Sequence, residues 1–475
     1  MASISIARLP AVSTGKTRGF ASSFGNASVI FLLFVAVLAP VITISSGLPW
    51  FRAEQLALVP MGLVYLWFLL AGVARPVRHN GLFLIGVIYC GFILVSLFVG
   101  TAILGHTFLY RDLYEIPKAL LPVVFFTVGL EAPLSETAMR RLLTFFSISV
   151  VPVCLYAWTQ WMNLGISRLL NQLYSGGAHD EGALAHYRRV FSTMGNPNIL
   201  GQLLTWAIAA FTLALLLRVG SRILNLLLVL ASLVTLAMTG SRYGLLNTGL
   251  VVMLIFCLSF SDRRRRRTLV ALLIVLLPVF VGITFVVARS NQATLDRFQT
   301  LRDPLHTDSL SGRLEDLWPD ADKEFLSSPL FGHGPNKAAF SDIVTDSEYL
   351  DVLKEFGILG FLAYSAYYIY ALRHLWRGLK IKSMCDHRME SRLPVNSWAL
   401  QFSFIMLVTA LVMNVGMSTF YSAPLQGFFW LWMGIGASAS RAIDSARVVR
   451  REDLTGRAYR LAIKSGGSRL NCPRG

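Results

Sequence analysis

The 475-residue sequence contains little charge and few cysteines. Only 15% of its residues are Asp, Glu, Lys or Arg, whereas a soluble domain usually has about 25%. The 5 cysteines form no close pairs, which argues against a disulfide framework and against a thiolate metal site. Acidic residues are also scarce, with 26 against 43 basic ones. These low counts exclude an ordinary soluble globular protein.

Long apolar runs take the place of the missing charge. Hydrophobic residues make up 55% of the sequence, and the mean hydropathy is +0.58. A transmembrane helix needs about 20 mostly apolar residues, so these runs predict an all-α integral membrane protein with about twelve spans. The predicted spans are 27–44, 56–74, 81–104, 117–130, 142–162, 199–217, 223–239, 243–260, 269–288, 356–372, 398–419 and 424–440. The fourth is the weakest, because Lys118 and Glu131 closely bracket it.

The distribution of charge predicts the orientation of these spans. With the amino terminus in the cytoplasm, about two thirds of the 43 lysines and arginines fall on the cytoplasmic side, as the positive-inside rule requires. Most acidic residues fall outside. Removing the fourth span would turn the basic amino-terminal segments outward, so we retain it. The net charge of +17 then reflects membrane topology and predicts no nucleic-acid partner.

This topology divides the chain into five parts. They are a cytoplasmic tail (1–26), nine spans (27–288), a long periplasmic loop (289–347), three spans (348–440) and a basic cytoplasmic tail (441–475). The first 26 residues do not have the pattern of a signal peptide. The basic tail 441–475 either binds lipid headgroups or only enforces the topology of the spans.

Two outer loops are long enough to carry function. They are 163–197, within the first nine spans, and 289–347. Apolar residues from Leu310 to Phe325 recur at helical spacing, which predicts an amphipathic helix that restarts near Pro319. This helix either lies on the outer leaflet or packs on the bundle as a lid.

Three polar clusters precede spans that run inward, at 187–198, 239–244 and 345–349. Helix capping explains their small polar residues. Asn196 before Pro197 and Ser241 before the eighth span are natural N-caps, and Thr345 with Glu348 has the spacing of a capping box.

Capping does not explain the arginines in the same clusters. Arg188, Arg189 and Arg242 place cations near helix amino termini, where they oppose the helix dipole. Guanidinium groups and exposed backbone N–H groups together suit an anion, and arginine binds phosphate with two parallel bonds. At headgroup depth, the predicted anion is a phosphate or diphosphate carried by a lipid.

Between residues 187 and 360 the chain resembles the O-antigen ligase and polysaccharide polymerase (Wzy-type) family of membrane glycosyltransferases. The resemblance is carried in order by the Arg188 to Asn198 run, Ser241-Arg242, Gly312 to Trp318, the Pro329 to Pro335 turn, and Tyr349 to Gly360. It implies a GT-C-like fold in the bacterial inner membrane and a glycan donor on undecaprenyl diphosphate. The implied partners are that donor, a glycan acceptor, the bilayer, a flippase and chain-length regulators. No metal or other cofactor is expected.

One departure from the family pattern bears on the reaction. The ligases of the family usually carry His-Asn just before the tyrosine-leucine pair, where this chain has Asp346-Ser347. The departure favours a polymerase that transfers the glycan to the terminal sugar of another lipid-linked repeat. Asp346 is the predicted general base, with Glu348 as its substitute. Nearby arginines would make a carboxylate a weaker base.

The remaining predicted site residues bind the diphosphate or the glycan. They are Arg188, Arg189, Arg242, Arg313, Asn196, Asn198, Ser241 and Tyr349. His333 in the glycine-rich turn is expected to be a satisfied loop histidine. Two alternatives stay open. The first is ligase-type transfer of the finished glycan to lipid A core or another acceptor. The second is a twelve-span transporter or flippase, which the scarcity of charge within the spans disfavours.

Overall fold

The structure is a computed structural model of the chain, and it describes most residues from 81 onward. The described residues are 29, 31–32, 35–39, 41–42, 51–52, 81–131, 135–174, 184–260, 262–290, 295, 311–335, 345–384, 394–417 and 423–464. The predicted span 56–74 lies outside them, as do both ends of the chain and parts of both long loops.

Helices make up nearly all of the regular structure in these residues, which confirms the all-α prediction. The α-helices are α3 Gly81–Phe98, α4 Glu115–Glu131, α5 Glu136–Trp161, α6 Gly165–Tyr174, α8 Pro197–Leu217, α9 Arg222–Thr239, α10 Arg242–Ser259, α11 Arg263–Arg289, α14 Trp318–Ser327, α15 Glu348–Ser383, α17 Pro394–Met413 and α18 Ala423–Lys464. Short π and 3-10 turns are η1 Val99–Ile103, η2 Tyr110–Tyr114, η3 Ser192–Met194 and η6 Arg313–Leu317. Strands β1 Val41–Ile42 and β2 Phe51–Arg52 form one antiparallel pair.

Among the described residues, 8 helices are long and apolar enough to cross a membrane. They coincide with the predicted third to ninth spans and the eleventh, and the weak fourth span lies within the segment Asp112–Glu131. Helices α15 and α18 cover the tenth and twelfth predicted spans but are not among the 8. The chain is therefore a multi-pass membrane protein, while the count of twelve spans stays a prediction.

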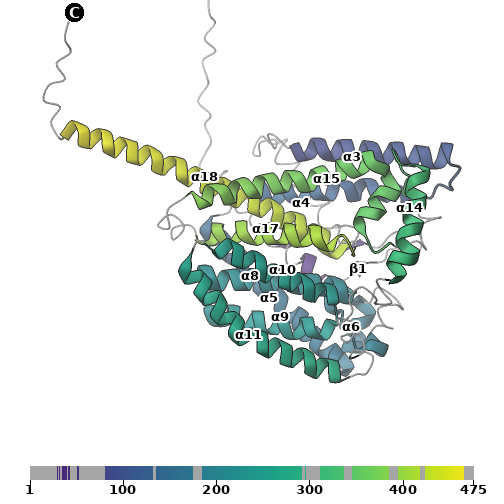
Figure 1. Cartoon of the computed structure of the whole chain (residues 1–475), viewed down its shortest axis with the longest axis horizontal. Helices are drawn as coiled ribbons and strands as arrows, with labels where there is room; N and C mark the ends of the chain where they lie inside the picture. Colours follow the sequence, from purple (N-terminus) through teal and green to yellow (C-terminus); the bar gives the residue numbers. More distant parts are fainter. Residues whose placement is uncertain are drawn as a thin grey trace, which may run out of the picture.

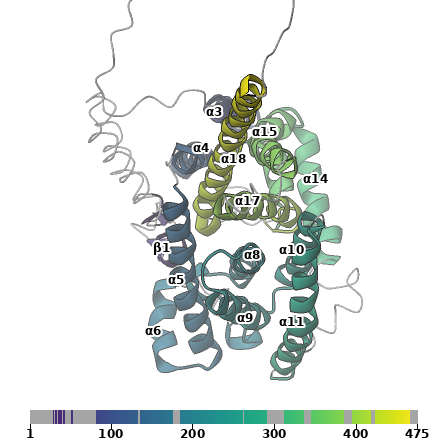
Figure 2. The same ribbon diagram turned by 90° about the vertical axis from the view of Figure 1, so that its left-hand side faces the viewer.

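The long helices run side by side, and α8 is the most enclosed of them (Figures 1 and 2). Seen along the bundle, α8 lies among α5, α9, α10 and α17, while α3, α4, α15 and α18 form a neighbouring group. Nearly every side chain of α8 is buried. Helix α11 is the opposite case, since only Leu269, Val287 and Ala288 are buried in it. An apolar helix with so few protein contacts is expected to face lipid.

Aromatic side chains fill the space between the two groups. Phe146 of α5 stacks on Phe211 of α8 with ring centroids 5.5 Å apart, and its ring also lies 6.3 Å from that of Trp432 in α18. Two of the indole nitrogens find acceptors: Trp206 donates to the Thr409 hydroxyl at 3.0 Å, and Trp398 donates to the Ala210 carbonyl at 2.8 Å. These bonds allow Trp206 and Trp398 to be buried without a polar penalty, whereas the buried indole nitrogen of Trp432 has no hydrogen-bond partner among the described residues.

Helix α15 is interrupted at Gly357, whose φ of 65° and ψ of −171° are essentially accessible only to glycine. The interruption frees backbone groups on both sides, and the turn between Pro329 and Pro335 binds them. The bonds are His333 N to Lys354 O (3.2 Å), Gly334 N to Glu355 O (2.8 Å), Ile358 N to Pro329 O (2.8 Å) and Leu359 N to Leu330 O (3.3 Å). The turn after α14 thus replaces the missing helical bonds of α15 and fixes the two elements together.

Candidate functional site

The predicted site lies where α8, α10 and α15 begin. The structure confirms two of the predicted N-caps. The Asn196 side chain accepts a hydrogen bond from the Asn198 N–H at 2.8 Å, and the Ser241 hydroxyl oxygen accepts one from the Gly244 N–H at 3.1 Å. Ser241 is fully buried. These two polar side chains therefore serve the helix starts that carry the arginines.

The predicted capping box at Thr345 and Glu348 is wrong. Helix α15 begins after Ser347, which makes no side-chain cap bond. The Thr345 hydroxyl oxygen instead accepts a hydrogen bond from the Ser347 N–H at 3.1 Å, and the same hydroxyl lies 2.8 Å from Asp351 Oδ1. The reason is that Glu348 is turned into the protein, where Tyr364 donates to its carboxylate. A carboxylate held there cannot reach back to the helix start.

The end of α17 joins two of these helix starts. The Glu348 N–H donates to the Asn414 carbonyl at 3.0 Å, which fixes α15 to the residue after α17. Two residues further on, Gly416 packs against the ring of Tyr243 in the first turn of α10, where any larger residue would collide with that ring. The starts of α10 and α15 therefore both contact one short segment after α17.

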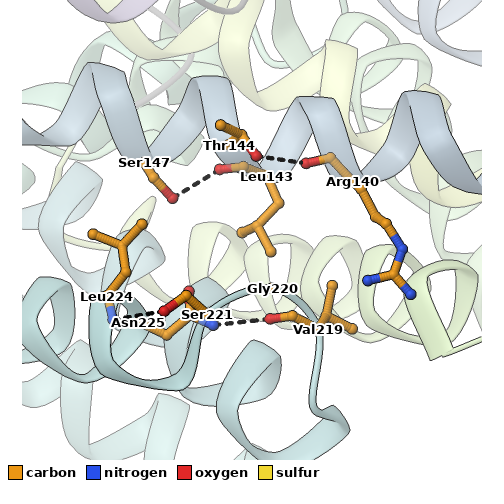
Figure 3. A pocket seen from close by; sticks show the side chains of 9 residues that line it. All are labelled: Arg140, Leu143, Thr144, Ser147, Val219, Gly220, Ser221, Leu224 and Asn225. Carbon is orange, nitrogen blue, oxygen red and sulfur yellow. Dashed lines mark hydrogen bonds between the residues drawn. The ribbon is translucent and has the colours of Figure 1, made fainter.

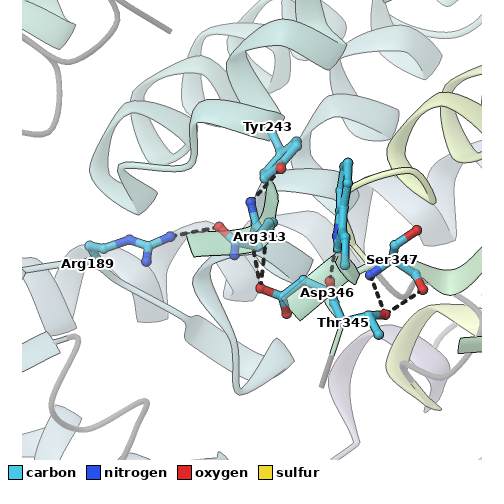
Figure 4. Close-up of polar contacts among 8 residues, drawn as sticks. Arg189, Tyr243, Arg313, Thr345, Asp346 and Ser347 are labelled. Carbon is cyan, nitrogen blue, oxygen red and sulfur yellow. Dashed lines mark hydrogen bonds and ion pairs between the residues drawn. The ribbon is translucent and has the colours of Figure 1, made fainter. Parts of the chain in front are cut away.

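Arg313 connects the same two helix starts through its side chain (Figure 4). Its Nη1 donates to the Tyr243 hydroxyl at 2.6 Å, and its Nη2 and Nε donate to Asp346 Oδ2 at 2.7 and 3.2 Å. Arg313 is 8% exposed, whereas 48% of the Asp346 side chain is exposed. Both bonds end on Oδ2, so Oδ1 accepts no hydrogen bond within the described part of the chain. The aspartate is anchored at one oxygen and open at the other.

The adjacent arginines 188 and 189 have different surroundings. Arg189 is 8% exposed, and it donates from Nε to the Thr239 carbonyl at 2.9 Å and from Nη2 to Asn198 Oδ1 at 2.7 Å. Arg188 is exposed, and its guanidinium carbon lies 5.5 Å from the centre of the Trp161 ring. Arg189 therefore ties α8 to the end of α9, while Arg188 presents its N–H groups at the surface.

The other predicted site residues support these groups. Arg242 is half-buried in the first turn of α10, next to Tyr243. Tyr349 is half-buried, and its hydroxyl donates to the Leu411 carbonyl at 2.7 Å. Glu348 is fully buried, so its carboxylate does not face the surface from which a substrate would approach.

Two of the candidate residues have a strained backbone. Arg188 has a φ of 50° and Asp346 a φ of 54°, in the left-handed region that non-glycine residues seldom adopt. Such strain costs about 1–3 kcal/mol per residue and persists only where surrounding contacts impose it.

Helix α14 covers part of this region. The Trp318 indole nitrogen donates to the Thr345 carbonyl at 3.0 Å, and Ala321 is 1% exposed. These contacts favour the predicted lid packed on the bundle over a helix lying in the leaflet. Trp318 and Pro319 open α14 directly after the π-turn η6, so the predicted restart near Pro319 is confirmed.

His333 is 5% exposed and satisfied, as predicted. Its Nδ1 lies 2.9 Å from Nε2 of His106, and its Nε2 lies 2.8 Å from the Glu324 carbonyl oxygen. Because a carbonyl only accepts, we assign a proton to His333 Nε2 and a donated bond from His106 to His333 Nδ1. The imidazole pair joins α14 to the segment after α3.

A separate small cavity lies between the start of α5 and the turn from α8 to α9 (Figure 3). Arg140, Thr144, Ser221 and Asn225 are among its lining residues. Because α8 begins near Arg189 and this cavity adjoins the other end of α8, it does not belong to the arginine site.

Comparison with known proteins finds a family match over part of the chain. Residues 226–365 match the family model described as O-Antigen ligase. The matched segment runs from α9 into α15, so it contains Ser241, Arg242, Arg313 and Asp346. The match supports the resemblance to the O-antigen ligase and Wzy-type family that the motifs predicted, and that family suggests glycosyltransferase-like ligase or polymerase activity. Among curated proteins, none matches the chain.

Sequence reasoning missed two contributors to the site. The Tyr243 hydroxyl accepts a bond from Arg313, and Gln160 Oε1 accepts from the Phe191 and Ser192 N–H groups at 3.1 and 2.8 Å, just after the arginine pair. Gln160 could have been noticed as an amide inside an otherwise apolar run, since a polar group there needs a partner.

Proposed function

We propose that the protein is a polysaccharide polymerase. It transfers a glycan from undecaprenyl diphosphate to the terminal sugar hydroxyl of another lipid-linked repeat, in O-antigen or exopolysaccharide synthesis. The supporting observation is the Arg313–Asp346 pair, which places a carboxylate with one open oxygen beside the start of α10, the helix that carries Arg242. In this proposal, the site opens to the periplasm and both termini lie in the cytoplasm of the inner membrane.

The proposed reaction needs one proton acceptor and one site for negative charge. The acceptor hydroxyl oxygen attacks the anomeric carbon, the bond from that carbon to the diphosphate oxygen breaks, and the hydroxyl proton passes to Asp346 Oδ1. The electron pair of the broken bond leaves on undecaprenyl diphosphate. A general base of this kind contributes about 100- to 10,000-fold.

Charge on the leaving diphosphate would be stabilised by arginine. Arg188 is the first candidate, because its guanidinium lies over the Trp161 ring and makes no hydrogen bond or ion pair among the described residues. Arg242 lies in the first turn of α10, where backbone N–H groups and the helix dipole also favour an anion. Each well-placed donor is worth about 100- to 1,000-fold in rate. The proposal assigns no step to a metal ion.

Glu348 takes a positioning role in this proposal. Its carboxylate accepts from Tyr364, whose hydroxyl oxygen lies 2.9 Å from the Tyr368 hydroxyl and can accept its hydrogen, while Asn414 Nδ2 donates to the Tyr368 hydroxyl oxygen at 3.2 Å. This buried network fixes the start of α15, two residues from Asp346. A buried hydrogen-bond network of this kind holds one geometry only when its members are satisfied.

Ligase-type transfer to lipid A core or another acceptor is the second candidate, since the matching family model is described by that activity. Reconstitution with lipid-linked repeats separates the two. A polymerase converts single repeats into a ladder of longer lipid-linked chains without any other acceptor. If chain length stays at one repeat until a second acceptor is added, the polymerase proposal is wrong.

A further inference from the structure

Helix α6 differs from the lid helix α14 in carrying a large uncovered apolar face. Its three faces can be separated by residue spacing, at about 100° per residue. Ser167, Leu170, Asn171 and Tyr174 point toward the protein, where the Tyr174 hydroxyl donates to the Leu38 carbonyl at 2.7 Å. The remaining positions are exposed, and they divide into an apolar and a polar face.

The apolar face consists of Ile166, Leu169 and Leu173, which are 58%, 64% and 54% exposed. The polar face consists of Arg168 and Gln172, both exposed. A helix with one face on protein, one apolar face and one charged or polar face is suited to the boundary of a membrane, where it meets protein, acyl chains and water at once.

The apolar face continues a surface that is expected to touch lipid. On the membrane-spanning helix α5, the exposed side chains Ile148, Val151 and Leu155 recur at helical spacing, and Met162 extends the same stripe. After one turn at Asn163, the exposed apolar residues of α6 follow. This continuity argues for acyl chains as the occupant, because one lipid surface then covers both helices.

Gln160 connects α6 to the arginine segment. Its Nε2 donates to Asn171 Oδ1 of α6 at 2.8 Å, and its Oε1 accepts the N–H groups of Phe191 and Ser192. The Tyr156 hydroxyl also donates to Asn171 Oδ1 at 2.8 Å. Gln160 is 3% exposed, so these bonds are shielded from water. Only Val190 separates Arg188 and Arg189 from the two N–H groups that Gln160 holds.

We propose that the apolar face of α6 binds the acyl chains of the adjoining membrane leaflet, and that Gln160 transmits the depth of α6 to the segment carrying Arg188. The first half is independent of the enzymatic proposal, and the second half rests on it. A helix at a fixed depth would set the height of Arg188 relative to the phosphate of a membrane-bound substrate.

The membrane contact can be measured without any activity. In a chain whose five native cysteines are replaced, single cysteines at Leu169 or Leu173 are labelled with an environment-sensitive dye in lipid nanodiscs. We expect blue-shifted emission that lipids with a nitroxide on the acyl chain quench. Matched cysteines at Arg168 and Gln172 should give water-like emission and little quenching.

Two outcomes would overturn the contact. Water-like, unquenched emission at Leu169 and Leu173 would show that this face meets water. Emission that is blue-shifted but insensitive to nitroxide lipids would show that a protein covers it instead.

The coupling is tested with Leu169→Glu and the control Arg168→Glu. A misplaced binding group can cost up to about 100-fold in rate, so we expect Leu169→Glu to raise the donor KM or lower kcat/KM by about 10- to 100-fold. Gln160→Leu should lower kcat/KM by a similar factor. In the same variant, a dye on a cysteine at Leu169 or Leu173 should still be quenched by nitroxide lipids. If the labels report lipid contact but neither variant changes kcat/KM, the coupling is wrong and the enzymatic proposal stands.

Discussion

Arg313 holds Asp346 by one carboxylate oxygen, with two donated bonds to Oδ2 and a third bond to the Tyr243 hydroxyl. Since the pairing leaves Oδ1 exposed, anchoring and proton transfer can use different atoms of one side chain.

The first prediction concerns this pair. Asp346→Asn should lower polymer synthesis by about 100- to 10,000-fold, because the amide keeps the bond-accepting oxygen but cannot take a proton. Arg313→Ala should cause a comparable loss, and the double variant should lose much less than the product of the two, because the residues act as one unit. Chain length and rate are measured with lipid-linked repeats.

The matched control is Asp320→Asn on the neighbouring helix α14. Asp320 is 56% exposed and pairs only with Lys323 within the described residues, so its loss should leave the rate within twofold, about the size of a surface-pair effect. Full activity of Asp346→Asn at normal protein levels would remove Asp346 from the mechanism.

The second prediction separates the adjacent arginines. Arg188→Ala should lower turnover by about 100- to 1,000-fold with little change in melting temperature, because the side chain makes no hydrogen bond in the described part of the chain. Arg189→Ala should lower the melting temperature, because it leaves the Thr239 carbonyl and Asn198 without their donor. Activity and thermal unfolding are measured on the same nanodisc preparations. Equal behaviour of the two variants in both measurements would contradict the assignment.

The third prediction concerns the break in α15. Gly357→Ala should destabilise the protein by at least about 1–3 kcal/mol, because an alanine is strained at this φ and its Cβ would collide with the Leu330 carbonyl. The control is Gly91→Ala in α3, where a Cβ would meet no neighbour within 4 Å. The melting temperature should be lower than that of the native protein for Gly357→Ala and unchanged for Gly91→Ala. An unchanged transition would mean that the docked turn does not depend on the glycine backbone.

The fourth prediction is a pH dependence at the histidine pair. Burial lowers the pKa of His106 from its ordinary 6.5, and the nearby His333 lowers it further, while Glu324 acts in the opposite direction. The folded protein therefore resists protonation of His106 more than the unfolded chain does. The contribution of neutral His106 to the free energy of unfolding is complete above pH 6.5. It is lost as the pH falls through the lower pKa that His106 has in the folded protein. The melting temperature should fall on acidification, and His106→Gln should reduce the slope.

Much of the fold was predictable from the sequence. Apolar runs located the helices, including the weak span at 117–130, because burial in lipid requires long apolar segments. Asn196 and Ser241 were predicted as caps because an N-cap depends only on neighbouring residues. Those parts of the structure follow from local chemistry.

The contacts that assemble the site were not predictable in the same way. The bond from Arg313 to Asp346 joins residues 33 apart, and Ser96 of α3 donates to the Glu355 carbonyl across 259 residues. The proposed capping box failed for the same reason, since a tertiary partner, Tyr364, drew Glu348 away. A single sequence also cannot tell that Arg188 is exposed and Arg189 buried, because the bonds that bury Arg189 reach the distant Thr239 carbonyl and Asn198.

The left-handed backbone at position 346 limits which amino acids can stand there. Asparagine, aspartate and histidine tolerate this conformation better than other residues with a side chain. An asparagine or a histidine could therefore replace Asp346 without forcing the loop into another backbone conformation. One substitution would then exchange the carboxylate for an amide or an imidazole at an unchanged position.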